Sequence, residues 1–389
     1  MPCMEGERRL VKIRPLTKLA LSLGVGSLVL AACGSSSVAV SAHRGPQSLA
    51  ANYATVLESP SGNLFTEAQA YQHGQVLEAK SGVLRLMTPQ GVSTRGGVSL
   101  ALTPGGRTSW AAVMAHLELY VSPIYVGPID DWHAAELPTA VAPFPGSILP
   151  VDGNNAMAIV GSKAHGAGNQ ELVRISATGS VTQMLATNPT LLHLGATVHC
   201  GAPVYESLTG SFSNPTLLAA CRSGSEVAFV SPLTRSIVAE RPPKGYRYLG
   251  FSAVGDLTNG TESVAAAVLA PVGGGADEVS LVGSPAGAPM AKLHGRPIAS
   301  PSFAVSASGD WVLVPLAGGK SQVIEYSPTG ALLADRSGPK EGQGIGISSG
   351  GHALVVAANP NDTTITLWRD GTRGFVKSGS LSIPEGVNG

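Results

Sequence analysis

The fold is decided by the stretch Phe303-Ala-Val-Ser-Ala-Ser-Gly309-Asp-Trp-Val-Leu-Val314, in which two apolar runs of strand length flank a tight turn rich in Ser and Gly. The same pattern returns 42 positions later in Gly346-Ile-Ser-Ser-Gly-Gly351-His-Ala-Leu-Val-Val356. A third copy, Val98–Val113, surrounds Gly106. Short apolar runs bounded by such turns predict β-hairpins.

Looser copies of the turn recur along the chain, and the last three each precede an apolar run. The four looser copies are Pro60–Gly62, Asp152–Gly153, Ser213–Asn214 and Asn259–Gly260. Counted with the three clear copies, the turns lie about 48 residues apart on average, and a period of roughly 40–50 residues is typical of β-propellers. The strands that follow the turns are also similar to one another, since the stretch Gln322–Leu333 resembles Glu171–Thr182 in sequence.

These repeats predict an all-β protein, a seven-bladed β-propeller that occupies residues 51–389. The uneven spacing leaves six or eight blades open. A blade of four strands cannot bury both of its faces alone, and closing a ring of blades removes long exposed sheet edges. Two β-sandwich domains are the alternative, but they would need a linker near the middle of the chain, where none is found.

The balance of charges excludes a nucleic-acid partner of the usual basic kind. Lys and Arg number 25 and Asp and Glu number 25, so no basic excess exists to displace counterions from phosphates. Charged residues make up only 13% of the 389 residues, while Gly alone occurs 49 times. This composition also disfavours coiled coils and helical bundles.

The first 33 residues predict export and attachment to a membrane. A basic segment precedes residues 19–32, an uncharged run that is too short to span a bilayer and matches the core of a signal peptide. The run ends in Leu30-Ala-Ala-Cys33-Gly-Ser, which resembles the lipobox of bacterial lipoproteins. The resemblance implies removal of residues 1–32 and acylation of Cys33 with diacylglycerol and palmitate. An ordinary signal peptide followed by a chance Cys is the alternative.

Residues 33–50 begin with the acylated Cys33, and the Ser, Gly and Ala residues that follow it predict a flexible tether. Cys200 and Cys221 remain as a pair, which in an exported chain predicts a disulfide. The loop between them would contain about 20 residues, which corresponds to roughly 3 kcal/mol of stabilisation. Two buried free thiols are the alternative. The His and Cys residues lack the spacing of a zinc site, so we expect neither a metal nor another cofactor.

The hairpins resemble those of bacterial β-propellers of the WD40/YVTN-like and Asp-box (sialidase-like) superfamilies. The likeness is carried by Ser306–Trp311, Thr103–Trp110 and Trp132–Pro138. The Asp that defines an Asp-box turn is replaced by Ser308 in one copy and by Gly105 in another. The resemblance therefore implies the fold and no particular activity.

Two loops combine charged and aromatic residues and are candidate ligand contacts. One places two carboxylates beside an indole and an imidazole, which suits a sugar platform, while a turn whose Trp packs between blades is the plainer alternative. The other is a basic, aromatic connector, which suits an anionic partner or simply leads into a strand. The residues are Asp130, Asp131, Trp132 and His133 in the first loop and Tyr246, Arg247 and Tyr248 in the second.

One stretch matches a catalytic pattern, because Gly346-Ile-Ser348-Ser-Gly350 has the G-x-S-x-G form of a nucleophile elbow. That elbow requires a helix after the Ser. The apolar run 353–357 has strand length and follows instead, so we interpret Ser348 as part of a turn.

The sequence therefore predicts a lipid-anchored, monomeric propeller on the extracytoplasmic face of the cell membrane. Its expected function is that of a non-catalytic binding or scaffold module for a protein, a peptide or a glycan at the cell envelope. A sialidase-like glycoside hydrolase is the alternative, with acidic and Arg side chains from several blades meeting at one mouth of the ring. No catalytic residue is identified from the sequence.

Overall fold

The structure is a computed structural model, and the residues it describes all belong to the compact unit Gly45–Gly389. It describes residues 49, 55–58, 64–70, 73–80, 83–86, 98–102, 109–114, 122–128, 133–137, 140–141, 148–150, 154–162, 170–186, 203–211, 214–221, 223–231, 234, 236–253, 265–283, 289–306, 309–348, 351–358 and 364–382. Every regular element in these ranges is a β-strand.

The strands form six hydrogen-bonded sheets. The largest sheet contains β1 (Thr55–Glu58), β2 (Leu64–Ala70), β3 (His73–Lys80), β4 (Val83–Leu86), β26 (Gly342–Ile347), β27 (Ala353–Ala358), β28 (Thr364–Gly371) and β29 (Gly374–Ser382). A four-stranded sheet contains β5 (Val98–Leu102), β6 (Ser109–Met114), β7 (Ser122–Pro128) and β8 (His133–Leu137). A five-stranded sheet contains β9 (Ala140–Val141), β10 (Ile148–Pro150), β11 (Asn155–Ser162), β12 (Gln170–Ser176) and β13 (Val181–Ala186).

Three further sheets have four strands each. They contain β14 (Pro203–Ser211), β15 (Asn214–Cys221), β16 (Val227–Ser231) and β17 (Ser236–Glu240); β18 (Tyr246–Ala253), β19 (Ala265–Pro271), β20 (Glu278–Val282) and β21 (Ala291–Lys292); and β22 (Ser302–Ser306), β23 (Gly309–Leu316), β24 (Lys320–Tyr326) and β25 (Leu332–Ser337).

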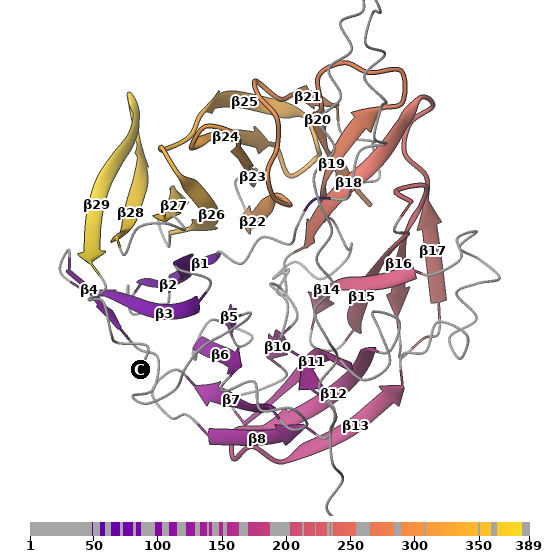
Figure 1. Ribbon diagram of the computed structural model, residues 1–389, viewed down its shortest axis with the longest axis vertical. Coiled ribbons are helices and arrows are strands. Elements are labelled where there is room, and N and C mark those ends of the chain that lie inside the picture. The colour runs from indigo at the N-terminus through magenta and orange to yellow at the C-terminus, as the bar shows by residue number, and fades with distance from the viewer. Residues whose placement is uncertain are drawn as a thin grey trace, which may run out of the picture. The chain divides into compact units, whose positions relative to one another are not determined.

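The sheets follow one another round a ring (Figure 1). In chain order, β1, β5, β10, β14, β18, β22 and β26 each contact the next, and β26 returns to contact β1. These strands line the inside of the ring, and each begins a four-stranded antiparallel meander that runs outward. The arrangement confirms the prediction of an all-β propeller.

The number of separate blades differs from the seven expected. Five sheets of four or five strands stand alone as blades, while β1–β4 and β26–β29 share one eight-stranded sheet. The two halves are joined because the outer strands β29 and β4 pair in parallel, with Ser380 opposite Val83. Hydrogen bonding between the first and last meanders thus merges what the repeats alone would count as two blades.

A Ser- and Gly-based turn explains why the repeats form hairpins. In the turns after β12, β24 and β26, a Ser Oγ accepts a hydrogen bond of 3.0 Å from the backbone N–H four residues later. The residue before that N–H is a Gly with φ between 77° and 84°, a conformation that favours Gly. The three Ser residues are Ser176, Ser327 and Ser348. Ser348 therefore belongs to a turn between two strands, as the sequence predicted.

The core lies between neighbouring sheets. Strands β23 and β27 are buried at every residue, because both faces of a central strand are covered by the adjacent blades. The cluster between the β18–β21 and β22–β25 sheets includes Leu249, Val268, Val312 and Tyr326. Burying an aliphatic side chain of this size contributes about 1.5–3 kcal/mol. This cluster also contributes Leu316 to a hollow at one end of the two sheets.

Candidate functional site

In an antiparallel meander, the turns lie alternately at the two ends of the sheet. The second turn of a blade and the connector to the next blade therefore share one end, which we name the connector end. In the β18–β21 and β22–β25 sheets, this end collects segments 241–245, 271–277, 293–301, 317–319 and 338–341.

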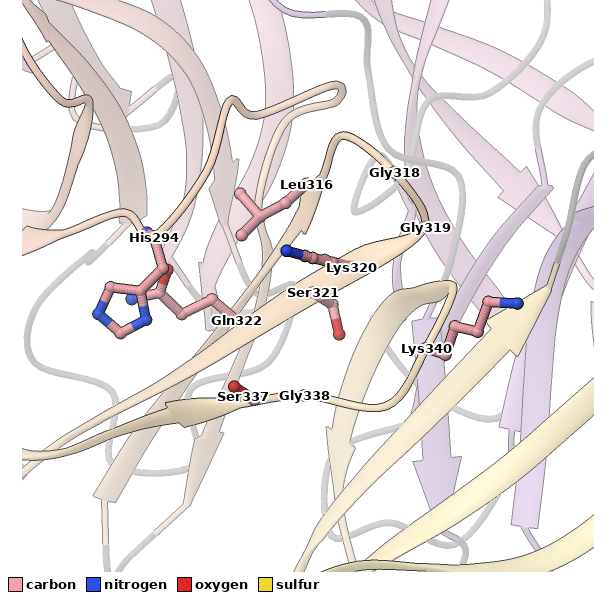
Figure 2. A pocket seen from close by; sticks show the side chains of 10 residues that line it. All are labelled: His294, Leu316, Gly318, Gly319, Lys320, Ser321, Gln322, Ser337, Gly338 and Lys340. Atoms are coloured by element: carbon pink, nitrogen blue, oxygen red, sulfur yellow. The ribbon is translucent and has the colours of Figure 1, made fainter.

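A hollow of about 490 Å³ lies at the connector end (Figure 2). We name it the His294 hollow. Its size falls within the range of sites for small ligands, about 300–1,000 Å³. The lining residues are His294, Leu316, Gly318, Gly319, Lys320, Ser321, Gln322, Ser337, Gly338 and Lys340.

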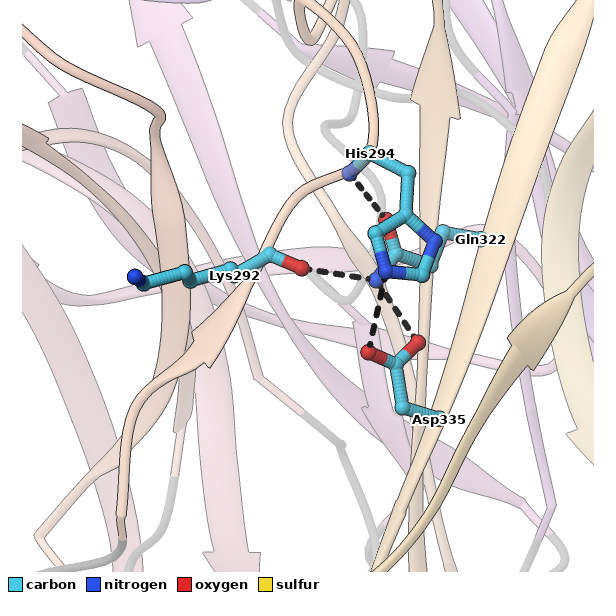
Figure 3. A network of polar contacts seen from close by, with 4 residues as sticks. All are labelled: Lys292, His294, Gln322 and Asp335. Carbon is cyan, nitrogen blue, oxygen red and sulfur yellow. Dashed lines mark hydrogen bonds and ion pairs between the residues drawn. The ribbon is translucent and has the colours of Figure 1, made fainter.

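Gln322 holds one wall of the hollow in place (Figure 3). Its side chain is only 1% exposed, and its Nε2 donates to Lys292 O at 2.9 Å and to Asp335 Oδ1 at 2.7 Å. Its Oε1 accepts from the backbone N–H of His294 at 2.8 Å. Lys292 ends β21, His294 follows that strand, and Gln322 belongs to the next sheet, so the amide joins two blades.

The imidazole of His294 lies next to the same carboxylate. Its Nε2 is 3.5 Å from Asp335 Oδ2, and the side chain is 62% exposed. Asp335 therefore has one oxygen toward Gln322 and the other toward His294. This orients the imidazole at the mouth of the hollow while leaving most of the ring accessible to solvent.

Lys320 gives the hollow a positive charge. No carboxylate forms an ion pair with Lys320 in the part of the chain that the structure describes. Figure 2 shows its ammonium group directed toward Leu316, whereas that of Lys340 is directed away from the other lining residues. Lys340 also has a carboxylate within reach, because its Nζ is 3.8 Å from Glu341 Oε1.

The rim of the hollow contains a strained residue. Among the described residues, Glu341 is the one non-glycine with positive φ, at 59°. Its N–H donates to Gly319 O at 2.7 Å, and its carbonyl oxygen accepts from Ala358 N at 3.1 Å. These two bonds hold the unfavourable conformation. They fix the Gly318–Gly319 turn, where φ values of 78° and 69° also favour Gly.

A second charged cluster flanks the hollow. The carbonyl oxygen of Arg296 accepts from Ala317 N at 2.8 Å, which places Arg296 beside the turn that lines the hollow. Burial raises the pKa of Asp277 above its ordinary value, although the nearby charges of Arg296 and Arg247 oppose the shift. Burial likewise lowers the pKa of Arg247, and Asp277 opposes that change. One carboxylate thus lies near two guanidinium groups.

A Tyr–Glu pair lies on the other face of the same sheet. Tyr246 Oη donates to Glu278 Oε1 at 3.3 Å, and Tyr246 packs against the cluster shared with the β14–β17 sheet. Successive residues of a strand point to opposite faces. Tyr246 and Glu278 are therefore separated by the sheet from Arg247 and Asp277. Burial raises the pKa of Tyr246, and the charge of Glu278 adds to this.

Some of the predicted site residues lie in described strands, and the others lie outside the described residues. Tyr246, Arg247 and Tyr248 begin β18, with Tyr248 buried at 5% exposure and its pKa raised by burial. His133 begins β8. Cys221 ends β15 and is 3% exposed. The residues Cys33, Asp130, Asp131, Trp132 and Cys200 lie outside the described residues, so the acylation, the disulfide and the first candidate loop stay predictions.

The sequence did not point to the His294 hollow. His294, Lys320 and Ser337 belong to three segments, and none has a neighbour in the sequence that suggests a site. Gln322 lies in a repeat recognised from the sequence, yet its role depends on a partner in another blade. The nearest signal was the basic connector at 241–248, which the structure places at the same end of the blades as the hollow.

Comparisons with known proteins show distant likenesses. No family model matches the sequence, and no curated protein matches it. Among solved structures, the chain is similar to a prolyl endopeptidase, one of two such enzymes studied for their inter-domain dynamics. The two share 12% sequence identity at a TM-score of 0.49, and the match covers 87% of this chain and 51% of the endopeptidase. The present chain thus spans about half the length of that enzyme.

Two other structures are similar to a comparable extent. The Dos1 propeller shares 10% identity at a TM-score of 0.42, over 76% of this chain and 74% of that one. A variant of the Synechocystis apocarotenoid oxygenase also shares 10% identity at a TM-score of 0.42, over 73% of this chain and 71% of that one. At this distance no family is assigned to the chain.

Proposed function

We propose that the protein is a non-catalytic binding β-propeller that holds an anionic group, a carboxylate or a phosphate, in the His294 hollow. The observation that carries the proposal is Lys320, a cation on the wall of the hollow with no acidic partner among the described residues. The Ser337 hydroxyl and the Gly318–Gly319 backbone line the same space. Hydroxyl and backbone N–H donors suit the remaining oxygens of an anion.

A glycoside hydrolase has less support from the described residues. A sialidase-like site would combine several arginines with a Tyr–Glu pair at one mouth of the ring. Among the described residues the Tyr246–Glu278 pair and Arg247 are not brought together, because they lie on opposite faces of their sheet. The raised pKa of Tyr246 also disfavours a phenolate nucleophile. Arg336, in another blade, is engaged by Glu325 and Asp370.

We further propose that this module works outside the cytoplasm, held to the cell membrane by a lipid on Cys33. The lipobox resemblance and the Cys200–Cys221 pattern support this location. Within the described ranges, no helix is long and apolar enough to cross a membrane. On this proposal the protein is a monomer, and its ligand is an anionic glycan or a protein partner that presents an acidic group.

Titration calorimetry on the full chain in detergent tests the binding proposal. The probes are inorganic phosphate and D-glucuronate, with neutral D-glucose as the control, so that the two anion sources are distinguished. We expect at least one anion to bind and Lys320→Gln to weaken it by about tenfold or more, since a hydrogen bond to a charged group contributes about 1.5–3 kcal/mol.

The matched control is Lys377→Gln, because Lys377 is an exposed lysine on the outer strand β29. This variant should bind the anion as the unmodified protein does. Failure of both anions to bind would overturn the proposal. Equal affinity of the Lys320→Gln and unmodified proteins would overturn the assignment of the site.

A further inference from the structure

Leu49, in the segment that precedes the first strand, is attached to the inner strand of a distant blade. Its backbone N–H donates to Leu249 O at 2.7 Å. Leu249 lies where the register between β18 and β19 shifts, between Tyr248 and Gly250. Such a bulge leaves its extra residue outside the ladder of strand hydrogen bonds. Leu49 therefore supplies the partner that β19 does not provide.

The side chain of Leu49 has a socket in the same place. It packs against the apolar cluster between the β18–β21 and β22–β25 sheets. The socket depends on the absence of a side chain at Gly250, where a Cβ would lie 3.1 Å from Leu49 Cβ and 2.6 Å from Ser300 Oγ. Both the backbone and the side chain of Leu49 thus contact this pair of blades.

The cluster that holds Leu49 also builds the wall of the His294 hollow. Leu316 belongs to the cluster and lines the hollow. Leu293 belongs to it as well, directly precedes His294, and donates its backbone N–H to Asp277 O at 2.8 Å. Close-packed interiors transmit small displacements, because their side chains have little free volume in which to relax.

We infer that Leu49 is a positioning residue for the His294 hollow. It connects the chain before β1 at this residue with the ligand site, through one continuous apolar cluster. The inference rests on the proposed function for its ligand, but the attachment itself can be measured without any ligand. By linkage, an anion in the hollow and Leu49 in its socket stabilise each other by the same factor.

Hydrogen–deuterium exchange on the full chain in detergent measures the attachment. In the unmodified protein the Leu49 amide should exchange slowly, because it donates to Leu249 O. Leu49→Ala should raise the exchange rate in the Leu316–Lys320 turn without ligand. Leu333→Ala, a leucine that is 55% exposed, is the matched control and should leave that turn unchanged.

Anion binding provides the readout that a merely structural contact would not change. With the phosphate or glucuronate probe that binds, Leu49→Ala should weaken affinity by between about twofold and thirtyfold. Leu49→Met conserves volume and should stay within about twofold of the unmodified protein. The reciprocal expectation is that the probe slows exchange of the Leu49 amide.

A second pair of variants keeps the test decisive if Leu49→Ala does not fold. Gly250→Ala should disturb the socket, whereas Gly273→Ala places its Cβ in open space and should have no effect. Unchanged exchange at 316–320 in Leu49→Ala or Gly250→Ala would overturn the inference, whether or not an anion binds. If Leu49→Ala speeds amide exchange in the Leu316–Lys320 turn but leaves the affinity for the anion unchanged, the inference is also overturned. Leu49 would then stabilise the fold without positioning the ligand site.

Discussion

Asp310 shows what the burial of one carboxyl group does to this fold. It belongs to β23, opposite Val305 and Tyr326 in the sheet, and is 8% exposed. Burial raises the pKa of Asp310 from its ordinary value of 3.8 to about 6. The folded protein therefore retains a proton on Asp310 at pH values where the unfolded chain has lost it.

Because the folded state binds the extra proton, the free energy of unfolding falls as the pH rises from about 4 through about 6. A shift of this size corresponds to about 2–3 kcal/mol. We expect Asp310→Asn to be more stable than the unmodified protein by that amount at pH 7.5 and equal to it at pH 4.

Urea unfolding at both pH values measures the difference. The unmodified protein at pH 4 is the internal control, since Asp310 is then protonated in the folded state. A pH dependence between 4 and 7 that is the same in Asp310→Asn would show that this carboxyl does not cause it.

At the scale of strands and sheets, charged and amide side chains join neighbouring blades. Arg336 of β25 reaches Glu325 of its own sheet at 3.1 Å and Asp370 of β28 at 3.0 Å, and its guanidinium lies 5.1 Å from the ring centre of Trp311. Gln322 performs the same task on the other side of the β22–β25 sheet. Blades are thus fastened by side chains as well as by apolar packing.

Gln322→Glu tests whether the hydrogen bonds of Gln322 hold the two blades together, because Glu has almost the same size and shape as Gln. The carboxylate can still accept from His294 N–H, but it cannot donate to Lys292 O or to Asp335. A buried acceptor left without a donor costs about 1–3 kcal/mol. We expect a loss of about 3 kcal/mol at pH 7, measured by urea unfolding.

Partial recovery of Gln322→Glu at acidic pH, where the new carboxyl is protonated and can donate, is the accompanying expectation. An unfolding midpoint equal to that of the unmodified protein at pH 7 would show that these hydrogen bonds do not hold the two blades together.

At the scale of the whole molecule, the ring is closed by contacts between its first and last meanders. β26 contacts β1 inside the ring, and β29 pairs with β4 outside it. The outer pairing joins only Ser380 and Val83, so the closure of the ring depends mainly on the contact between β1 and β26. Leu49, which precedes β1, is bound to Leu249 and packs against the apolar cluster that also contributes Leu316 to the proposed ligand site.

The proposed lipid anchor belongs to this scale as well. Cys33→Ala should move the protein from the membrane fraction to the soluble fraction, or leave the precursor unprocessed, as judged by fractionation and intact mass. Cys221→Ala removes a different cysteine and should leave the distribution between the fractions unchanged. Detergent-dependent membrane association of Cys33→Ala would contradict the lipoprotein assignment.

The sequence by itself determined the class of fold, because hairpins are local. A few neighbouring residues are enough to specify each turn, as at Ser306–Gly309 and in the Ser-x-x-Gly turns at Ser176 and Ser327. Each hairpin can therefore be recognised from its own short stretch of sequence. Their period implied repeated meanders. It did not show that the first and last meanders share a sheet, since that pairing joins residues almost 300 positions apart.

Only the tertiary structure decided the candidate site. His294, Gln322 and Lys340 line one hollow because two blades and their connectors converge at one end, and no local pattern records that convergence. The same holds for Leu49, whose partner Leu249 lies 200 positions away. Strand alternation likewise separated Tyr246 from Arg247, which adjoin in sequence but face different blades. Local chemistry thus specifies the hairpins, while the packing of sheets round the ring specifies which side chains can act together.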